Sequence, residues 1–165
     1  MIRHHTRGLD KLSNVAFLQT PHQLVMFGVG QTHYGIDIAL VDEILPVLPI
    51  TATPGAPAGV LGIVDVRKRI VPVFDLHVRF GVPTPASNAE ARLILVSVGD
   101  DSVALLVDSV EEVLTVGRDE FQGVAAPGGR NDIGYLRGVL RRDDLLLLWV
   151  DPSLLVPAQA LALAA

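Results

Sequence analysis

The chain has no cysteine, which excludes disulfide bonds and thiolate chemistry. Long hydrophobic runs are absent too. No unbroken apolar stretch is longer than that from Leu145 to Val150, whereas a membrane-spanning helix needs about 20 residues. The basic N-terminal residues Arg3 and Arg7 are not followed by the apolar core of a signal peptide. We therefore expect a cytoplasmic protein that does not insert directly into a membrane.

Basic and aromatic residues are scarce. The formal net charge is -5, and binding to nucleic acid needs a basic face that neutralises phosphates. We therefore expect no nucleic-acid partner. Aromatic residues make up 5% of the chain and are scattered, which disfavours a sugar-binding site around a pair of catalytic carboxylates. Hydrophobic residues make up 50%, enough for a real core and for apolar surface that partners can use.

Motifs for catalysis or phosphate binding are also missing. There is no Gly-x-Ser-x-Gly nucleophile elbow, and the glycines around Gly28 lack the spacing of a phosphate-binding loop. The histidines lack ligand spacing and are expected at the surface or in the tail: His4, His5, His22, His33 and His77. Asp75 and Asp151 each end an expected strand before a helical turn, which favours N-caps over catalysis. We expect no enzyme, no cofactor and no metal site.

The stretch from Val60 to Gly81 predicts a β-hairpin. Runs rich in Val, Ile and Phe flank the basic turn Arg67-Lys68-Arg69, and such residues suit the pleated, half-buried surface of a sheet. A helical turn is expected over 76–80, ended by Gly81. Three positive charges in an acidic protein make the turn a candidate recognition surface, with a solvated tip as the alternative.

The rest of the chain also has the pattern of strands. Expected strands cover 23–29, 34–38, 91–98, 103–114, 135–140 and 145–150. The stretch 39–45 is ambiguous and fits a helical turn followed by an extended piece, and the prolines and glycines of 46–59 predict a connector. These patterns predict an all-β protein with short helical turns.

An internal repeat relates the two halves. The stretch Tyr34–Leu45 aligns with Val103–Leu114 at a shift of 69 residues, which also places Glu43 on Glu112. Gly62 aligns with Gly138, and Asp75 with Asp151, at a shift of 76. Arg67 has only Arg141 and Arg142 loosely opposite it. Two similar β units with a shared core seam are therefore expected, and closure of each into a small barrel would remove exposed edges.

The repeat suggests a division of the chain. We expect a flexible N-terminal tail at 1–20, one folded domain at 21–155 and a C-terminal tail at 156–165. Within the domain, the first subdomain is expected mainly at 21–85 and the second mainly at 89–155, with an interleaving of the two left open.

Several segments resemble the CheW-like domain of chemotaxis coupling proteins. The resemblance rests on Leu24–Gly30, Tyr34–Ile38, Val41–Ile44, Thr53–Pro57, Val60–Arg67, Ile70–Leu76 and Tyr135–Val139, and covers about residues 23 to 155. It implies two five-stranded SH3-like β-barrels around a hydrophobic seam. It also implies a non-catalytic adaptor that links the cytoplasmic tips of chemoreceptors to the regulatory domain of the histidine kinase CheA, at the membrane-associated receptor array.

The resemblance implies a receptor-binding site at Val41, Glu43, Gly62 and Arg67. Arg67 offers a planar fork of donors for receptor carboxylates, and Ile44 with its neighbours would form an apolar shelf for a helix. The alternative for Glu43 and Arg67 is an ordinary surface ion pair. The contacts with the kinase are not carried over residue by residue.

The chain departs from the usual family pattern at three positions. Asp65 stands where the family usually has Asn, Lys68 where it has Gly, and His77 where it has Arg. Lys68 lacks the ease of glycine in a left-handed conformation, so the turn type could differ. These changes leave open whether the pathway is flagellar chemotaxis or a related array such as pilus-based motility. A small ligand-binding or hydrolytic β-barrel protein, with Asp75 in the active site, is the alternative from another class.

Overall fold

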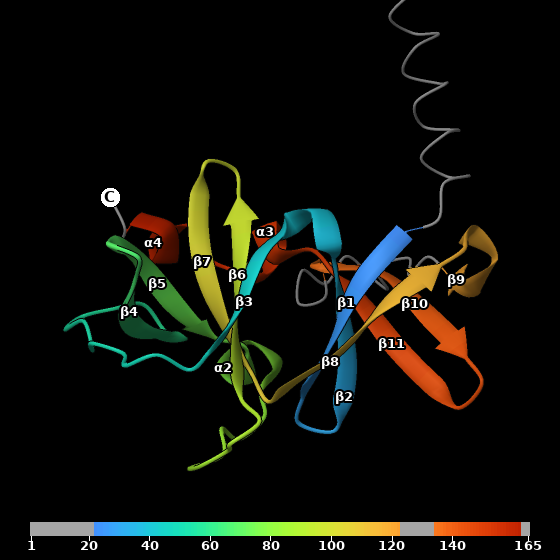
Figure 1. Cartoon of the computed structure of the whole chain (residues 1–165), viewed down its shortest axis with the longest axis horizontal. Coiled ribbons are helices and arrows are strands. Elements are labelled where there is room, and N and C mark those ends of the chain that lie inside the picture. Colours follow the sequence, from blue (N-terminus) through green and yellow to red (C-terminus); the bar gives the residue numbers. More distant parts are fainter. Residues whose placement is uncertain (1–21, 123–133, 163–165) are drawn as a thin grey trace, which may run out of the picture.

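The computed structural model describes residues 22–122 and 134–162, and the N-terminal tail expected at 1–20 lies outside them. Two sheets lie side by side (Figure 1). One has the strand order β8 (Ser109–Val116), β1 (His22–Val29), β2 (Thr32–Asp37), β11 (Leu145–Val150), β10 (Leu136–Arg142) and β9 (Phe121–Gln122). The other has the order β3 (Val41–Pro46), β6 (Arg92–Val98), β7 (Asp101–Val107), β5 (Arg69–Asp75) and β4 (Val60–Val66). The all-β fold class is confirmed.

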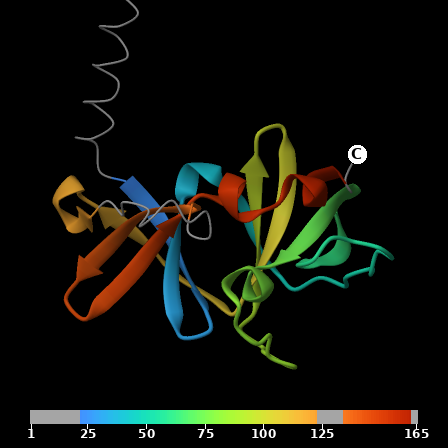
Figure 2. The same ribbon diagram turned by 180° about the vertical axis from the view of Figure 1, so that it is seen from behind.

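Short helical segments join the strands. They are η1 (Ile38–Leu40), α2 (Leu76–Phe80), η2 (Arg118–Glu120), α3 (Pro152–Leu155) and α4 (Ala158–Leu161). Figure 2 shows α3 and α4 on the face opposite to the one that Figure 1 presents. Among the helices of the described residues, none is long and apolar enough to span a membrane.

The two repeats exchange strands. The sheet of β3–β7 contains the hairpin β6–β7 from the second repeat together with β3, β4 and β5 from the first. The other sheet contains β1 and β2 from the first repeat with strands of the second. The division at 85–89 therefore does not coincide with the sheets. The reason is that β3 pairs with β6, and β8 with β1, so the later strands of each repeat form a sheet with the first hairpin of the other repeat.

The register of the strands follows the repeat. In the parallel pair β5–β7, Val73 lies opposite Ala104, and in the parallel pair β11–β2, Trp149 lies opposite Gly35. The shift of 76 residues relates Val73 to Trp149, and the shift of 69 residues relates Gly35 to Ala104, so the two pairs are equivalent. The second hairpin of each repeat also has a shift in strand register next to an equivalent glycine, Gly62 in the first repeat and Gly138 in the second. The internal repeat is thus a structural one.

Three hydrophobic clusters form the core. One lies within the β3–β7 sheet and includes Val64 and Leu93, and a second lies within the other sheet around Leu140. The third and largest combines residues of both sheets, such as Phe27 and Ile94. This third cluster is the hydrophobic seam that the repeat predicts.

The local predictions for the hairpin are confirmed. The strands β4 and β5 meet at a turn of Arg67 and Lys68, and α2 ends at Gly81, whose left-handed φ of 70° suits glycine. Asp75 and Asp151 are N-caps, because their side chains accept from the backbone N–H groups of His77 and Ser153. The cap interpretation of these two carboxylates therefore holds.

Two stretches differ from expectation. The strand expected over 103–114 is two strands, because the chain passes from one sheet to the other at Asp108. The tail expected at 156–165 is folded in its described part, since Val156 and Ala160 are 4% and 0% exposed and belong to the shared seam. The Ala- and Leu-rich composition that suggested a tail instead lets α4 pack closely.

Candidate functional site

The four predicted binding residues lie on the two edges of the β3–β7 sheet. Val41 and Glu43 are on the edge strand β3, Gly62 is on the opposite edge strand β4, and Arg67 is in the turn after β4. An ion pair joins Arg67 Nη2 to Glu43 Oε1. Because β3 and β4 are the outermost strands of the sheet, this contact bridges its two edges and helps to close the barrel.

The ion pair is largely open to solvent on the arginine side. The Arg67 side chain is 72% exposed and that of Glu43 is 29% exposed. Such a pair contributes only about 0 to 1 kcal/mol to stability. Since Glu43 engages one guanidinium nitrogen, the remaining donors of Arg67 face solvent and are available to a carboxylate of a partner.

The turn holds Arg67 in an uncommon conformation. Arg67 and Lys68 both have positive φ angles, 51° and 69°, as the central residues of a two-residue type I′ hairpin loop do. Asp65 Oδ1 accepts a hydrogen bond of 2.7 Å from the Lys68 backbone N–H. The Asp65 carboxylate thus stabilises a turn whose left-handed conformation lysine adopts less easily than glycine.

Gly62 acts through the backbone, since it has no side chain for a contact. It has a φ of 148°, and an added Cβ would lie 2.0 Å from the Thr51 carbonyl oxygen. The connector approaches this closely because Thr51 and Ile63 exchange two backbone hydrogen bonds of 2.9 Å. Gly62 thus positions the connector 46–59 beside β4.

Exposed apolar side chains lie on and just after the edge strand β3. Val41 packs against the shared seam, while Ile44 and Val47 are 41% and 44% exposed. Val113, the repeat counterpart of Ile44, is 48% exposed on β8, which is also an edge strand. The shelf expected around Ile44 therefore exists as exposed apolar surface, and the second repeat has a similar one.

Among the described residues, the second barrel has no ion pair between the counterparts of Glu43 and Arg67. The shift of 76 residues places Asp143 on Arg67, and both have a φ of 51°. This corrects the loose match to Arg141 and Arg142. Glu112 corresponds to Glu43, so both counterparts are acidic. Arg142 bonds to Glu120 through two contacts of 2.7 Å and to the Thr115 carbonyl at 2.8 Å.

His77 is the main residue that the sequence interpretation misplaced. It was expected at the surface, but it is 1% exposed. Its Nδ1 lies 2.5 Å from Asp75 Oδ1, and its Nε2 lies 2.7 Å from Asp108 Oδ1. Asp108 Oδ2 in turn accepts from the Gly30 backbone N–H at 2.7 Å. The cluster joins α2, which follows strand β5 of the β3–β7 sheet, to the β1–β2 turn of the other sheet.

The chemistry of this cluster is structural. Burial alone would lower the pKa of His77, but the hydrogen bonds to Asp75 and Asp108 outweigh it and raise the pKa above the ordinary 6.5. Because both ring nitrogens face carboxylates, the doubly protonated imidazolium fits the site and no nitrogen is free to act as a base. Within the described residues, no group of three or more histidine or acidic side chains is arranged to hold a metal ion.

Comparison with known families gives the assignment. The family model of the CheW-like domain matches residues 23–160, which cover both barrels. The chain belongs to the CheW family. Solved structures agree: the scaffolding protein TtCheW from Thermoanaerobacter tengcongensis has a TM-score of 0.76 and 27% identity, with 84% of this chain and 90% of that chain covered. This similar structure supports the interpretation that the two sheets of the chain form two SH3-like subdomains.

Curated relatives carry the same family name. The chemotaxis protein CheW of Treponema pallidum (strain Nichols) is 33% identical over 154 residues, covering 90% of this chain and 86% of that protein. That of Rhizobium meliloti (strain 1021) is 29% identical over 137 residues, covering 83% and 88%. The similarity therefore extends over nearly the whole length of these proteins.

Proposed function

We propose that this CheW-family protein is a non-catalytic adaptor that couples chemoreceptors to the histidine kinase CheA in chemotaxis signalling. The observation that carries the proposal is the family match over 23–160 together with similarity over 86% and 88% of the length of two proteins named chemotaxis protein CheW. The protein acts at the receptor array on the cytoplasmic side of the membrane. The regulatory domain of the kinase and the cytoplasmic tips of the receptors are its partners.

The receptor-binding site comprises Val41, Glu43, Gly62 and Arg67 in this proposal. Its support is the exposed guanidinium of Arg67, which pairs with Glu43 on the edge strand β3, together with the exposed Ile44 on the same strand. A receptor helix with carboxylates flanking an apolar stripe would complement this surface. Glu43 orients Arg67, and Gly62 positions the neighbouring connector.

Replacing Arg67 by glutamate is expected to weaken binding to a receptor cytoplasmic fragment about tenfold or more, because arginine in an interface is a frequent hot spot. The free energy of unfolding should change by less than about 1 kcal/mol, since the ion pair is exposed. Isothermal titration calorimetry and urea unfolding measure the two quantities. Arg141→Glu, at the corresponding end of the second barrel, is the matched control and should leave receptor binding unchanged.

The double variant Glu43→Arg with Arg67→Glu separates recognition from internal stabilisation. It restores an ion pair of reversed direction between the strand edges, so stability should return to that of the wild type. Receptor binding should stay weak, because the charges that face the partner are exchanged. Full recovery of binding in the double variant would show that the pair acts only within the protein.

Binding to the kinase tests the proposal as a whole. A pull-down with the regulatory domain of the cognate CheA should retain the wild-type protein, and also Arg67→Glu, because the proposal assigns Arg67 to the receptor and not to the kinase. Absence of kinase binding by the wild type would refute the adaptor function. A kinase from a pilus-based motility array that bound more tightly would assign the protein to that pathway instead.

A further inference from the structure

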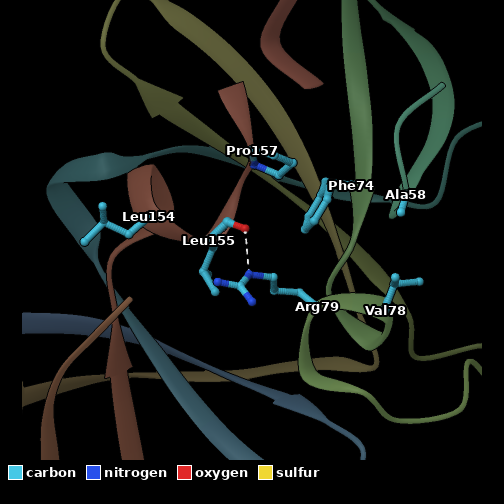
Figure 3. A pocket seen from close by; sticks show the side chains of 7 residues that line it. All are labelled: Ala58, Phe74, Val78, Arg79, Leu154, Leu155 and Pro157. Carbon is cyan, nitrogen blue, oxygen red and sulfur yellow. Dashed lines mark hydrogen bonds between the residues drawn. The ribbon is translucent and has the colours of Figure 1, made fainter. Parts of the chain in front are cut away.

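A cavity of about 330 Å³ lies between α2 and the segment that contains α3 (Figure 3). Its walls are mostly apolar: Ala58, Phe74, Val78, Leu154, Leu155 and Pro157, with Arg79 as the one charged lining residue. Val78 and Leu154 are 51% and 56% exposed and form an open rim. The shift of 76 residues relates these two side chains, so the cavity lies where the two repeats face each other.

A carbonyl oxygen and an aromatic ring hold Arg79 in place. Its Nε donates to the Leu155 carbonyl oxygen at 3.2 Å, and its guanidinium carbon lies 4.8 Å from the centre of the Tyr135 ring. No ion pair forms between Arg79 and any other residue in the described parts of the chain. The guanidinium is therefore oriented by two contacts, while its terminal nitrogens remain available to an anion.

The cavity is separate from the proposed receptor-binding site. The helical segments that line it face the viewer in Figure 2, whereas the edge strands β3 and β8 face the viewer in Figure 1. None of Val41, Glu43, Gly62 and Arg67 lines it. A ligand in the cavity could therefore bind together with a partner on β3.

We propose that this cavity binds a segment of a partner protein in which a carboxylate lies next to large aliphatic side chains. The carboxylate pairs with the Arg79 guanidinium, and the aliphatic side chains cover Val78, Leu154 and the Phe74 ring. The unpaired cation favours this occupant over a purely apolar one, because an apolar occupant would bury Arg79 without compensation. The proposal goes beyond the coupling function and does not rest on it.

The test uses two capped tetrapeptides and the full-length protein. One peptide has three leucines and a glutamate, and in the other glutamine replaces the glutamate. In two-dimensional ¹H–¹⁵N NMR titrations, the glutamate peptide should shift the amide signals of Val78, Arg79 and Leu154 and bind about tenfold more tightly than the glutamine peptide. Equal affinities, absence of binding, or shifts confined to other residues would each overturn the proposal.

Two variants locate the binding. Arg79→Gln keeps a donor near the Leu155 carbonyl and should abolish the preference for the glutamate peptide. Leu154→Glu places a carboxylate on the exposed rim and should weaken binding of that peptide about tenfold without affecting the core. Leu146→Glu, at a leucine that is 50% exposed on β11, is the control and should bind as the wild type does. Unchanged binding by both Arg79→Gln and Leu154→Glu would refute the site.

Discussion

Replacing His77 by alanine is expected to lower the free energy of unfolding by about 3 kcal/mol at pH 6, the low end for removing one partner of a buried charge pair. The reason is that the variant leaves the carboxylates of Asp75 and Asp108 close together without the imidazolium between them. The lower value of the destabilisation applies because the Asp108 side chain is 19% exposed and remains partly hydrated. Urea unfolding followed by circular dichroism measures the change.

The same variant should alter the dependence of stability on pH. The pKa of His77 is raised in the folded state, so its contribution is fully present below the unfolded-state pKa of about 6.5 and is lost as the pH rises through the folded-state value. The difference in stability between wild type and His77→Ala should therefore be largest at pH 6 and shrink towards pH 9. Parallel curves across this range would contradict the prediction.

A local measurement distinguishes this cluster from general destabilisation. Asp108 accepts from both the His77 ring and the Gly30 backbone N–H, so hydrogen exchange at Gly30 should accelerate in His77→Ala. His33→Ala is the control, because that side chain is 41% exposed beside Glu111. It should change stability by less than about 0.5 kcal/mol.

Local patterns were sufficient to predict many of the individual elements. Runs of β-branched and aromatic residues around a short basic turn identified the hairpin at 60–75, and position after a strand identified Asp75 and Asp151 as helix caps. These features depend on neighbours in the chain, which a sequence shows directly. The repeat added a long-range prediction, because two units of the same pattern must bury similar faces.

The exchange of strands between repeats could not be derived in this way. Along the chain, each repeat has the order hairpin, strand, hairpin. This order would be the same if β3 paired within its own repeat instead of with β6. The position of His77 was missed for a related reason. Its partner Asp108 is 31 residues away and reaches it only because the chain passes between the sheets there.

The candidate site was predicted in part. The sequence placed Glu43 and Arg67 as possible partners, and the structure joins them across the edges of one barrel. The repeat related Glu43 to Glu112, but it did not indicate that Arg67 has an acidic counterpart in Asp143. Nor did it indicate that the second barrel uses Arg142 with Glu120 for a similar closure. The two barrels therefore have similar backbone arrangements but different surface charges. A partner can distinguish them by electrostatic complementarity.

Replacing Gly62 by alanine is expected to lower the free energy of unfolding by about 2 to 4 kcal/mol. The new Cβ would lie 2.0 Å from the Thr51 carbonyl oxygen, so the connector must move and lose both hydrogen bonds with Ile63, each worth about 1 kcal/mol. The φ of 148° adds strain for any residue with a side chain. Urea unfolding measures the loss.

Gly138→Ala, at the equivalent position of the second barrel, is the matched control. Its Cβ would meet the Gln122 carbonyl at 3.3 Å and the Phe121 ring at 3.5 Å, which a small shift relieves, so a loss of about 1 kcal/mol or less is expected. Equal losses in the two variants would show that the connector does not constrain Gly62. In Gly62→Ala, weaker receptor binding should accompany lower stability, whereas Arg67→Glu should lose binding alone. That contrast separates the residue that positions the connector from the one that contacts the partner.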